Sequence, residues 1–97
     1  METEPVVVRN PDKSTFELHL GDRIVGRADY LEDDVRVVFT HTEVDPALNG
    51  QGLGSTLARG ALDAVQADGK RIVPQCSFIA VYVRRHADDY AGIIDVS

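Results

Sequence analysis

The chain has 97 residues, 43% of them hydrophobic and 27% charged, which is the composition of an ordinary globular protein. This length predicts one domain over residues 1–97 with a single core. A formal net charge of −6 disfavours nucleic acids and anionic membranes as partners, because both would be repelled. A membrane span is also not expected, since no apolar stretch approaches about 20 residues.

Cellular location and metal binding are constrained by the N-terminus and by the cysteine content. Residues 1–10 show no basic region followed by a long apolar run, so we expect no secretory signal and a cytoplasmic protein. Cys76 is the only cysteine, which fits a reducing compartment because no internal disulfide can form. A zinc site is not expected, since His19, His41 and His86 lack the spacing of metal ligands.

The first half of the chain has the pattern of an antiparallel β-meander. Residues 6–8 form a short valine run, and residues 14–20 alternate between apolar and polar side chains. Gly-Asp at 21–22 suits a two-residue hairpin turn before a strand that begins at residue 23. The acidic run at 32–34 predicts the next turn.

The strand predicted over residues 35–44 is the most apolar and should lie near the centre of the sheet. An uninterrupted strand has two faces. One face would carry Val35, Val37, Phe39, His41 and Glu43. The other would carry Val38, Thr40, Thr42 and Val44. A β-bulge would exchange these faces, and the sequence does not decide between the two arrangements.

The second half of the chain changes to helical periodicity. Apolar residues at helical spacing predict a helix from Leu53 to a stop at Gly69. A short strand over 71–75 should follow, and then a second helix that begins at an N-cap, Ser77. The predicted class is α+β: an antiparallel meander followed by a helix, a short strand and a C-terminal helix.

The segment "NGQGLGST" at 49–56 places three glycines between the central strand and the first helix. Free N–H groups at a helix N-terminus bind anions, and residues without Cβ atoms let an anion approach the backbone. The segment is not a P-loop, because no lysine follows the glycines, and it lacks the spacing of a dinucleotide fingerprint. The alternative is that these glycines only form a turn and relieve helix–sheet crowding.

This segment resembles the acetyl-coenzyme A motif of the GCN5-related N-acetyltransferase family, Gln/Arg-x-x-Gly-x-Gly/Ala. Gly52 and Gly54 are in register with that motif, while Asn49 stands where Gln or Arg is usual. The stretch "VPQCSFIAVYVRRHADDY" at 73–90 is similar to a P-x-C-x-Phe/Tyr stretch in a small single-domain subgroup of these proteins. The likeness covers roughly residues 14–94 and implies a minimal acyl-CoA N-acyltransferase fold.

The resemblance implies acetyl-CoA, or coenzyme A, as the bound cosubstrate. Backbone N–H groups of about 51–55 would bind the pyrophosphate, and the main chain near 43–45 would pair with the pantetheine arm. The residues implied in binding are Val44, Asn49, Gly50, Gln51, Gly52, Leu53, Gly54, Ser55 and Thr56. Arg59, Arg84 and Arg85 are candidates for the 3′-phosphate, although solvated helix faces would explain them equally well.

Four residues are candidates for the chemistry of acetyl transfer. Cys76 precedes a helix, where amides and the helix dipole lower a thiol pKa, so it would accept the acetyl group or protonate the leaving sulfur. Its alternative role is that of a small buried hydrophobe. His41 and Glu43 are candidates for the general base. The alternatives are that His41 is a partly buried histidine bonded to a neighbour and that Glu43 is a solvated residue at the end of the strand. Tyr82 is a candidate general acid for the leaving thiolate, and its alternative role is that of an aromatic residue of the core.

The leading interpretation is an acetyl-CoA-dependent N-acetyltransferase that acts on an unidentified amine, either a small molecule or a protein lysine. Longer members of the family place two helices after the first strand, but here only residues 10–13 separate the first two strands. The acceptor side should therefore be open. This favours the alternative of a non-catalytic acyl-CoA-binding or sensing module. A third possibility is a structural domain without a ligand. We expect a monomer or a weak dimer.

Overall fold

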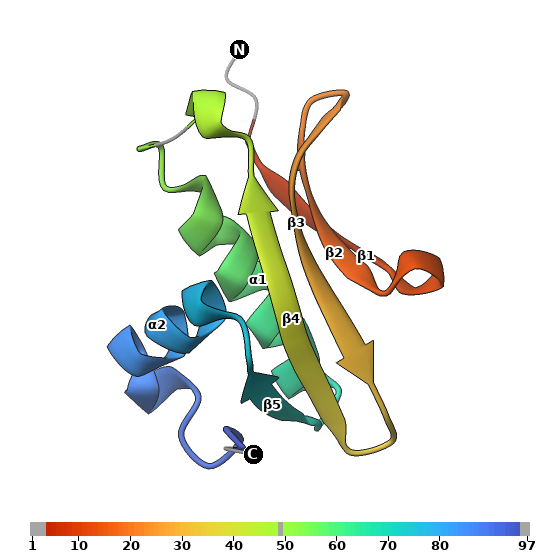
Figure 1. The fold of residues 1–97 in the computed structure, drawn as a ribbon, viewed down its shortest axis with the longest axis vertical. Helices are drawn as coiled ribbons and strands as arrows, with labels where there is room; N and C mark the ends of the chain where they lie inside the picture. The colour runs from red at the N-terminus through yellow and green to blue at the C-terminus, as the bar shows by residue number, and fades with distance from the viewer. Residues whose placement is uncertain (1–3, 49, 96–97) are drawn as a thin grey trace.

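The computed structural model describes residues 4–48 and 50–95. The α+β class is confirmed, with every predicted element in the predicted order (Figure 1). The sheet consists of β1 (Val6–Asn10), β2 (Thr15–Leu20), β3 (Arg23–Glu32), β4 (Arg36–Val44) and β5 (Arg71–Pro74). The helices are α1 (Leu53–Ala67) and α2 (Ser77–Arg85). Short 3-10 turns cover Pro11–Lys13, Pro46–Leu48 and Ala87–Asp89.

The strands lie in the order β1-β2-β3-β4-β5, antiparallel except for the parallel pair β4–β5. Helix α1 provides the crossover between β4 and β5 and runs behind the sheet, in contact with all five strands (Figure 1). Helix α2 lies beside β5 and contacts β4, β5 and α1. The face of β1–β3 turned away from α1 is crossed by no helix of the described chain, and we call it the open face.

The core lies between the sheet and α1, because the apolar alternation of the strands meets the apolar stripe of the helix there. Three aromatic rings form its centre, with centroids 5.2 Å apart for Phe16 and Tyr30 and 6.1 Å apart for Phe16 and Phe39. The C-terminal segment packs on this core: Tyr90 is fully buried and donates a hydrogen bond to Asp63, 3.1 Å away. Burial and this carboxylate raise the pKa of Tyr90 well above its usual value.

Local turn chemistry sets the ends of the elements. Gly21 and Gly69 both have positive φ, 62° and 74°, and lie where the hairpin turn and the end of α1 were predicted. The prediction of Ser77 as the N-cap of α2 is wrong by one residue. Cys76 has the extended backbone of the N-cap, and its carbonyl accepts the first helical hydrogen bond, from the Ala80 N–H.

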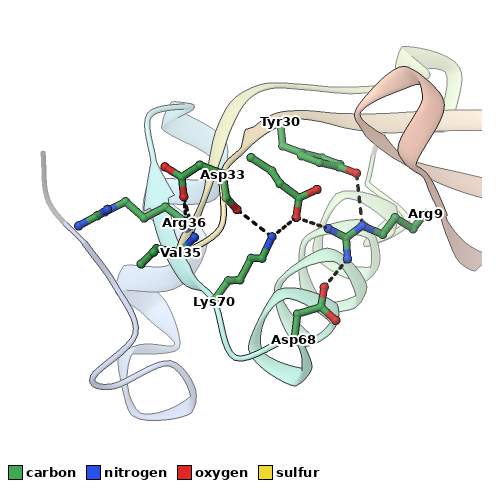
Figure 2. A network of polar contacts seen from close by, with 8 residues as sticks. Arg9, Tyr30, Asp33, Val35, Arg36, Asp68 and Lys70 are labelled. Carbon is green, nitrogen blue, oxygen red and sulfur yellow. Dashed lines mark hydrogen bonds and ion pairs between the residues drawn. The ribbon is translucent and has the colours of Figure 1, made fainter.

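Arg9 ties the edge strand β1 to the rest of the molecule (Figure 2). Its guanidinium lies over the rings of Phe16 and Tyr30, with Cζ 5.1 and 5.4 Å from their centroids. It also donates to the Tyr30 hydroxyl at 3.3 Å, to Glu32 at 3.1 Å and to Asp68 at 2.5 Å. Asp68 is the C-cap of α1, so one side chain joins β1, β3 and α1.

None of the helices in the described part of the chain is long and apolar enough to cross a membrane.

Candidate functional site

A β-bulge interrupts β4 at Thr40. His41 pairs with Asp29 and Phe39 pairs with Tyr30, so Thr40 is the extra residue between the two pairs. The bulge exchanges the faces of the strand beyond Phe39. The alternation of side chains expected for an uninterrupted strand therefore holds only up to Phe39. The predicted faces are wrong for the second half of β4.

As a result, Thr42 and Val44 turn toward the core and are half-buried, whereas His41 and Glu43 are exposed on the other side. The two candidate bases remain neighbours, with His41 Nε2 3.3 Å from Glu43 Oε1. Arg27 pairs with the second Glu43 oxygen at 2.5 Å and with Asp29 at 3.2 Å. These two carboxylates, Asp29 above all, hold the pKa of Arg27 above its usual range.

Strands β4 and β5 separate after Phe39. The pairing ends at Phe39–Pro74, and the Cys76 N–H donates to the Phe39 carbonyl at 2.9 Å as the chain turns into α2. Strand β4 continues to Val44 without β5 beside it. We call the point where Cys76 leaves β4 the strand fork.

The free edge of β4 beyond the strand fork can be assigned from its hydrogen bonds to β3. The Asp45 N–H donates to the Val25 carbonyl at 2.8 Å, so the backbone groups of Asp45 point toward β3. N–H and C=O groups alternate in direction along a strand, so those of Val44 and Thr42 point the other way. The backbone of Thr42 and Val44, which are about 7 Å apart along the strand, forms the free edge.

Cys76 lies at the strand fork. Its half-buried thiol donates a hydrogen bond to the Thr42 hydroxyl, with Sγ 3.3 Å from Oγ1. The cysteine thus combines two features: it is the N-cap of α2 and it contacts the free edge of β4. The predicted position of Cys76, after a strand and before a helix, is confirmed.

The glycine-rich turn adopts the backbone that glycine alone accepts readily. Gly50 and Gly52 have φ of 85° and 73°, and a methyl group built on either would meet no atom within 4 Å. Gly52 is the N-cap of α1 and has no side chain to accept from the first helical N–H groups, those of Leu53, Gly54 and Ser55. The N–H donors of the first turn of α1 therefore lie beside the open space over Gly50 and Gly52.

Thr56 differs from these residues. Its N–H and its hydroxyl both donate to the Gly52 carbonyl at 3.2 Å, so both groups are used within the helix. Gln51 is exposed beside the turn. The prediction for Asn49 lies outside the described residues.

A hollow of about 230 Å³ connects the turn to the free edge of β4. Its lining is Val44, Leu48, Gly50, Gly52, Leu53, Gly54, Ser55 and Phe78. One part of this lining is glycine backbone and the other part is apolar side chain. Such a hollow suits a ligand with an anionic group beside an apolar group.

Tyr82 is not brought to the strand fork. It lies six residues beyond Cys76, about 9 Å along the axis of α2, and is buried. Its ring packs 4.2 Å from that of His86 and under the Arg59 guanidinium, which lies 5.6 Å from the ring centroid. Arg59 in turn pairs with Asp89 at 2.9 Å.

Arg84 and Arg85 are exposed near the C-terminal end of α2. Among the described residues, no group of three or more histidine, cysteine or acidic side chains is placed to hold a metal.

Two residues of this region were not predicted from the sequence as part of the site. Thr42 was assigned to the face opposite His41 with no role, and Phe78 was given no role. The P-x-C-x-Phe/Tyr stretch was the available signal for Phe78, because it contains both Cys76 and Phe78.

Comparison with known families agrees with this geometry. The family model for GCN5-related N-acetyl-transferases matches residues 15–93, which include the bulged strand, the glycine-rich turn, the strand fork and α2. A search of curated proteins gives no match. Because the family model spans most of the chain, the chain belongs to the GCN5-related N-acetyltransferase family.

Proposed function

We propose that this protein is an acetyl-CoA-dependent N-acetyltransferase that transfers an acetyl group to an amine. The observation that carries the proposal is the order of three features along β4. The glycine-rich hollow adjoins Val44, the free backbone edge runs from Val44 to Thr42, and the Cys76 thiol contacts Thr42. A long ligand with an anion at one end and a thioester at the other fits this order.

The residues present suit coenzyme A. The N–H groups of Leu53, Gly54 and Ser55 would hold the pyrophosphate, aided by the positive end of the α1 dipole. Open space over Gly50 and Gly52 leaves room for phosphate oxygens. Thr56 would act only through the helix, because its donors are used by Gly52.

The pantetheine arm carries amides, and the free edge of β4 offers matching groups. The family resemblance implied that these contacts lie at about residues 43–45. The structure favours Val44 and Thr42, since the Asp45 N–H is bound to Val25 and the Glu43 carbonyl lies on the Gly26 side. Backbone pairing of this kind adds a ligand to a sheet edge in the way that a further strand would be added.

Bound acetyl-CoA would supply an acetyl group as an activated thioester. In the transfer, an amine nitrogen attacks the carbonyl carbon, the carbon–sulfur bond breaks, and the sulfur that leaves takes up a proton. In this proposal the Cys76 S–H donates that proton, and its hydrogen bond to the Thr42 hydroxyl orients it. Alternatively, a Cys76 thiolate would take the acetyl group and pass it to the amine.

His41 and Glu43 supply the base in this proposal. They are exposed on the side of β4 opposite Thr42, so an acceptor that arrives from that side would meet them first. Either side chain would accept the proton from the attacking amine. Tyr82 is the weakest of the four candidates, because it packs among Arg59, His86 and Tyr90.

A second function is a non-catalytic acyl-CoA-binding or sensing module. The open face favours it, because no helix of the described chain covers the side from which an acceptor would come. In either function we propose a cytoplasmic protein, present as a monomer or weak dimer, whose acceptor, if any, is a small amine or a protein lysine.

Turnover separates the two functions. Acetyl-CoA would be incubated with spermidine and with a lysine-containing peptide, and release of the coenzyme A thiol would be followed. If the protein is an enzyme, the wild type should release coenzyme A. Cys76→Ala or Glu43→Gln should lower the rate of this release at least ten-fold while acetyl-CoA still binds. Glu4→Gln, at an exposed residue of the described N-terminus, is the control. Binding of acetyl-CoA without release of coenzyme A in the presence of either amine would instead favour the sensing module.

A further inference from the structure

Phe78 is an aromatic side chain whose position is not explained by the core. Helix α2 buries Ile79, Tyr82 and Val83, which lie on one face. Phe78 lies off that face and is 41% exposed. Unlike the other exposed hydrophobic side chains, the Phe78 ring lines the hollow beside the glycine-rich turn, where a ligand could contact it.

The ring of Phe78 lies directly against the backbone of Gly54. A Cβ atom built on Gly54 would be 2.7 Å from Cζ of Phe78, closer than real Cβ contacts come, and 3.2 Å from Cε2, closer than most of them. A residue with a Cβ atom at position 54 would therefore have to displace the Phe78 ring. The glycine-rich turn and α2 are fitted to one another at this contact.

This contact places an aromatic wall beside the donors of the turn. Phe78, Leu48 and Val44 form the apolar side of the hollow, while Gly54 and Ser55 provide N–H groups on the other side. In coenzyme A, the dimethyl-substituted pantoyl group is one methylene away from the pyrophosphate. A pyrophosphate on the turn would bring those methyl groups onto this apolar side.

We infer that Phe78 is a binding residue that packs on the pantoyl group of acetyl-CoA, and that Gly54 is required to let the ring reach that position. The inference rests on the proposed binding of acetyl-CoA. The hollow would then have two halves: a phosphate half, in which backbone N–H groups bind the pyrophosphate, and a pantetheine half, in which Phe78 contacts the pantoyl group. The affinity for ligands that lack pantetheine should not depend on the Phe78 ring.

The test uses two ligands and calorimetric titration of the full chain. Adenosine 3′-phosphate 5′-diphosphate is coenzyme A without pantetheine, so it probes the phosphate half alone. Phe78→Ala should weaken acetyl-CoA binding on the order of ten-fold and leave binding of this nucleotide unchanged. Val81→Ala is the matched control, because Val81 is 38% exposed on the same helix but does not line the hollow.

Gly54→Ala gives an independent test of the same contact. Its methyl group would force the Phe78 ring aside, so this variant should also lose acetyl-CoA affinity. In the double variant Gly54→Ala/Phe78→Ala, the losses should not add, because the ring that the methyl group displaces is already absent. Thermal unfolding would verify that each variant is folded.

Three results would overturn the inference. Unchanged acetyl-CoA binding in Phe78→Ala would show that the ring does not contact the ligand. Equal losses for acetyl-CoA and the nucleotide would show that Phe78 acts on the whole turn rather than on pantetheine. A wild-type protein that binds neither ligand would contradict the proposed function itself, and this outcome is distinct from the other two.

Discussion

The Cys76 thiol donates a hydrogen bond to the Thr42 hydroxyl, with 3.3 Å between Sγ and Oγ1. This contact depends on the bulge at Thr40, because the bulge turns Thr42 toward α2. It also depends on the separation of β4 and β5 after Phe39, which brings the start of α2 against β4. Two local irregularities of the sheet thus produce one polar contact at the strand fork.

Thr42→Val should slow acyl transfer at Cys76 about ten-fold, because the Cys76 sulfur loses the hydroxyl that orients it. Thr42→Ser, which keeps the hydroxyl, should react at nearly the wild-type rate. Intact-mass measurement of Cys76 acetylation by acetyl-CoA would give these rates, with acetyl-CoA affinity measured separately. Equal rates in wild type and Thr42→Val would show that the hydrogen bond has no role in the chemistry.

Gly52→Ala should lower the free energy of unfolding by about 1 kcal/mol and abolish acetyl-CoA binding. The first effect follows from the left-handed φ of 73°, and the second from a methyl group in the open space beside the donors. Gly92→Ala is the matched control, since Gly92 has φ of 86° and similarly open space but does not line the hollow. Urea unfolding and ligand titration would be measured on both.

The control is expected to share the loss of stability and to keep full affinity. If Gly92→Ala also lost acetyl-CoA, the effect of Gly52→Ala would reflect global strain rather than the site.

Arg9→Ala should destabilise the fold by about 1–3 kcal/mol, because it removes two ring contacts and three hydrogen bonds that join β1 to β2, β3 and α1. Arg23→Ala is the comparison, since Arg23 is two-thirds exposed and makes an ion pair with Asp45, worth less than about 1 kcal/mol. Urea denaturation measures both. Equal losses would show that Arg9 is only another surface charge.

Asp95 gives the fold an acid-sensitive contact. Hydrogen bonds from Arg71 and then Arg36 hold the pKa of Asp95 below its ordinary value. A lowered pKa means that the carboxylate stabilises the fold above the unfolded value, near pH 4, and that this stabilisation is lost as pH falls through the folded pKa. Part of the acid destabilisation should therefore come from Asp95.

Asp95→Asn should unfold more readily at neutral pH and lose less stability than the wild type on acidification below pH 4. Urea midpoints at a series of pH values would show this, with Asp12→Asn, at an exposed carboxylate, as the control. Parallel pH profiles for Asp95→Asn and the wild type would mean that this contact contributes nothing.

The order of the elements could be predicted because local signals agreed with the tertiary structure. Alternation, the Gly21–Asp22 turn and the stop at Gly69 all act within a few residues. The register of β4 could not be predicted, since a bulge depends on pairing with β3 rather than on β4 alone. For the same reason, the contact of Thr42 with Cys76 could not be predicted, because the orientation of Thr42 follows from that bulge.

Phe78 shows a second limit. Its place beside Gly54 arises from the packing of α2 on α1, a contact between residues far apart in sequence. The helical period predicted the helix but gave no reason for an exposed ring at Phe78. The glycine pattern, in contrast, indicated the position of the hollow, because its backbone requirement is local.

The most direct test of the central claim is a titration of acetyl-CoA into ¹⁵N-labelled protein, with backbone amides followed by NMR. The account predicts shifts concentrated at Thr42, Val44 and residues 50–56, with smaller shifts near Cys76 and Phe78. Amides of β1 and of the turn at Gly21 should stay unchanged. If millimolar acetyl-CoA moved no amide in residues 50–56, the glycines would serve only the turn, and the proposed site would be wrong.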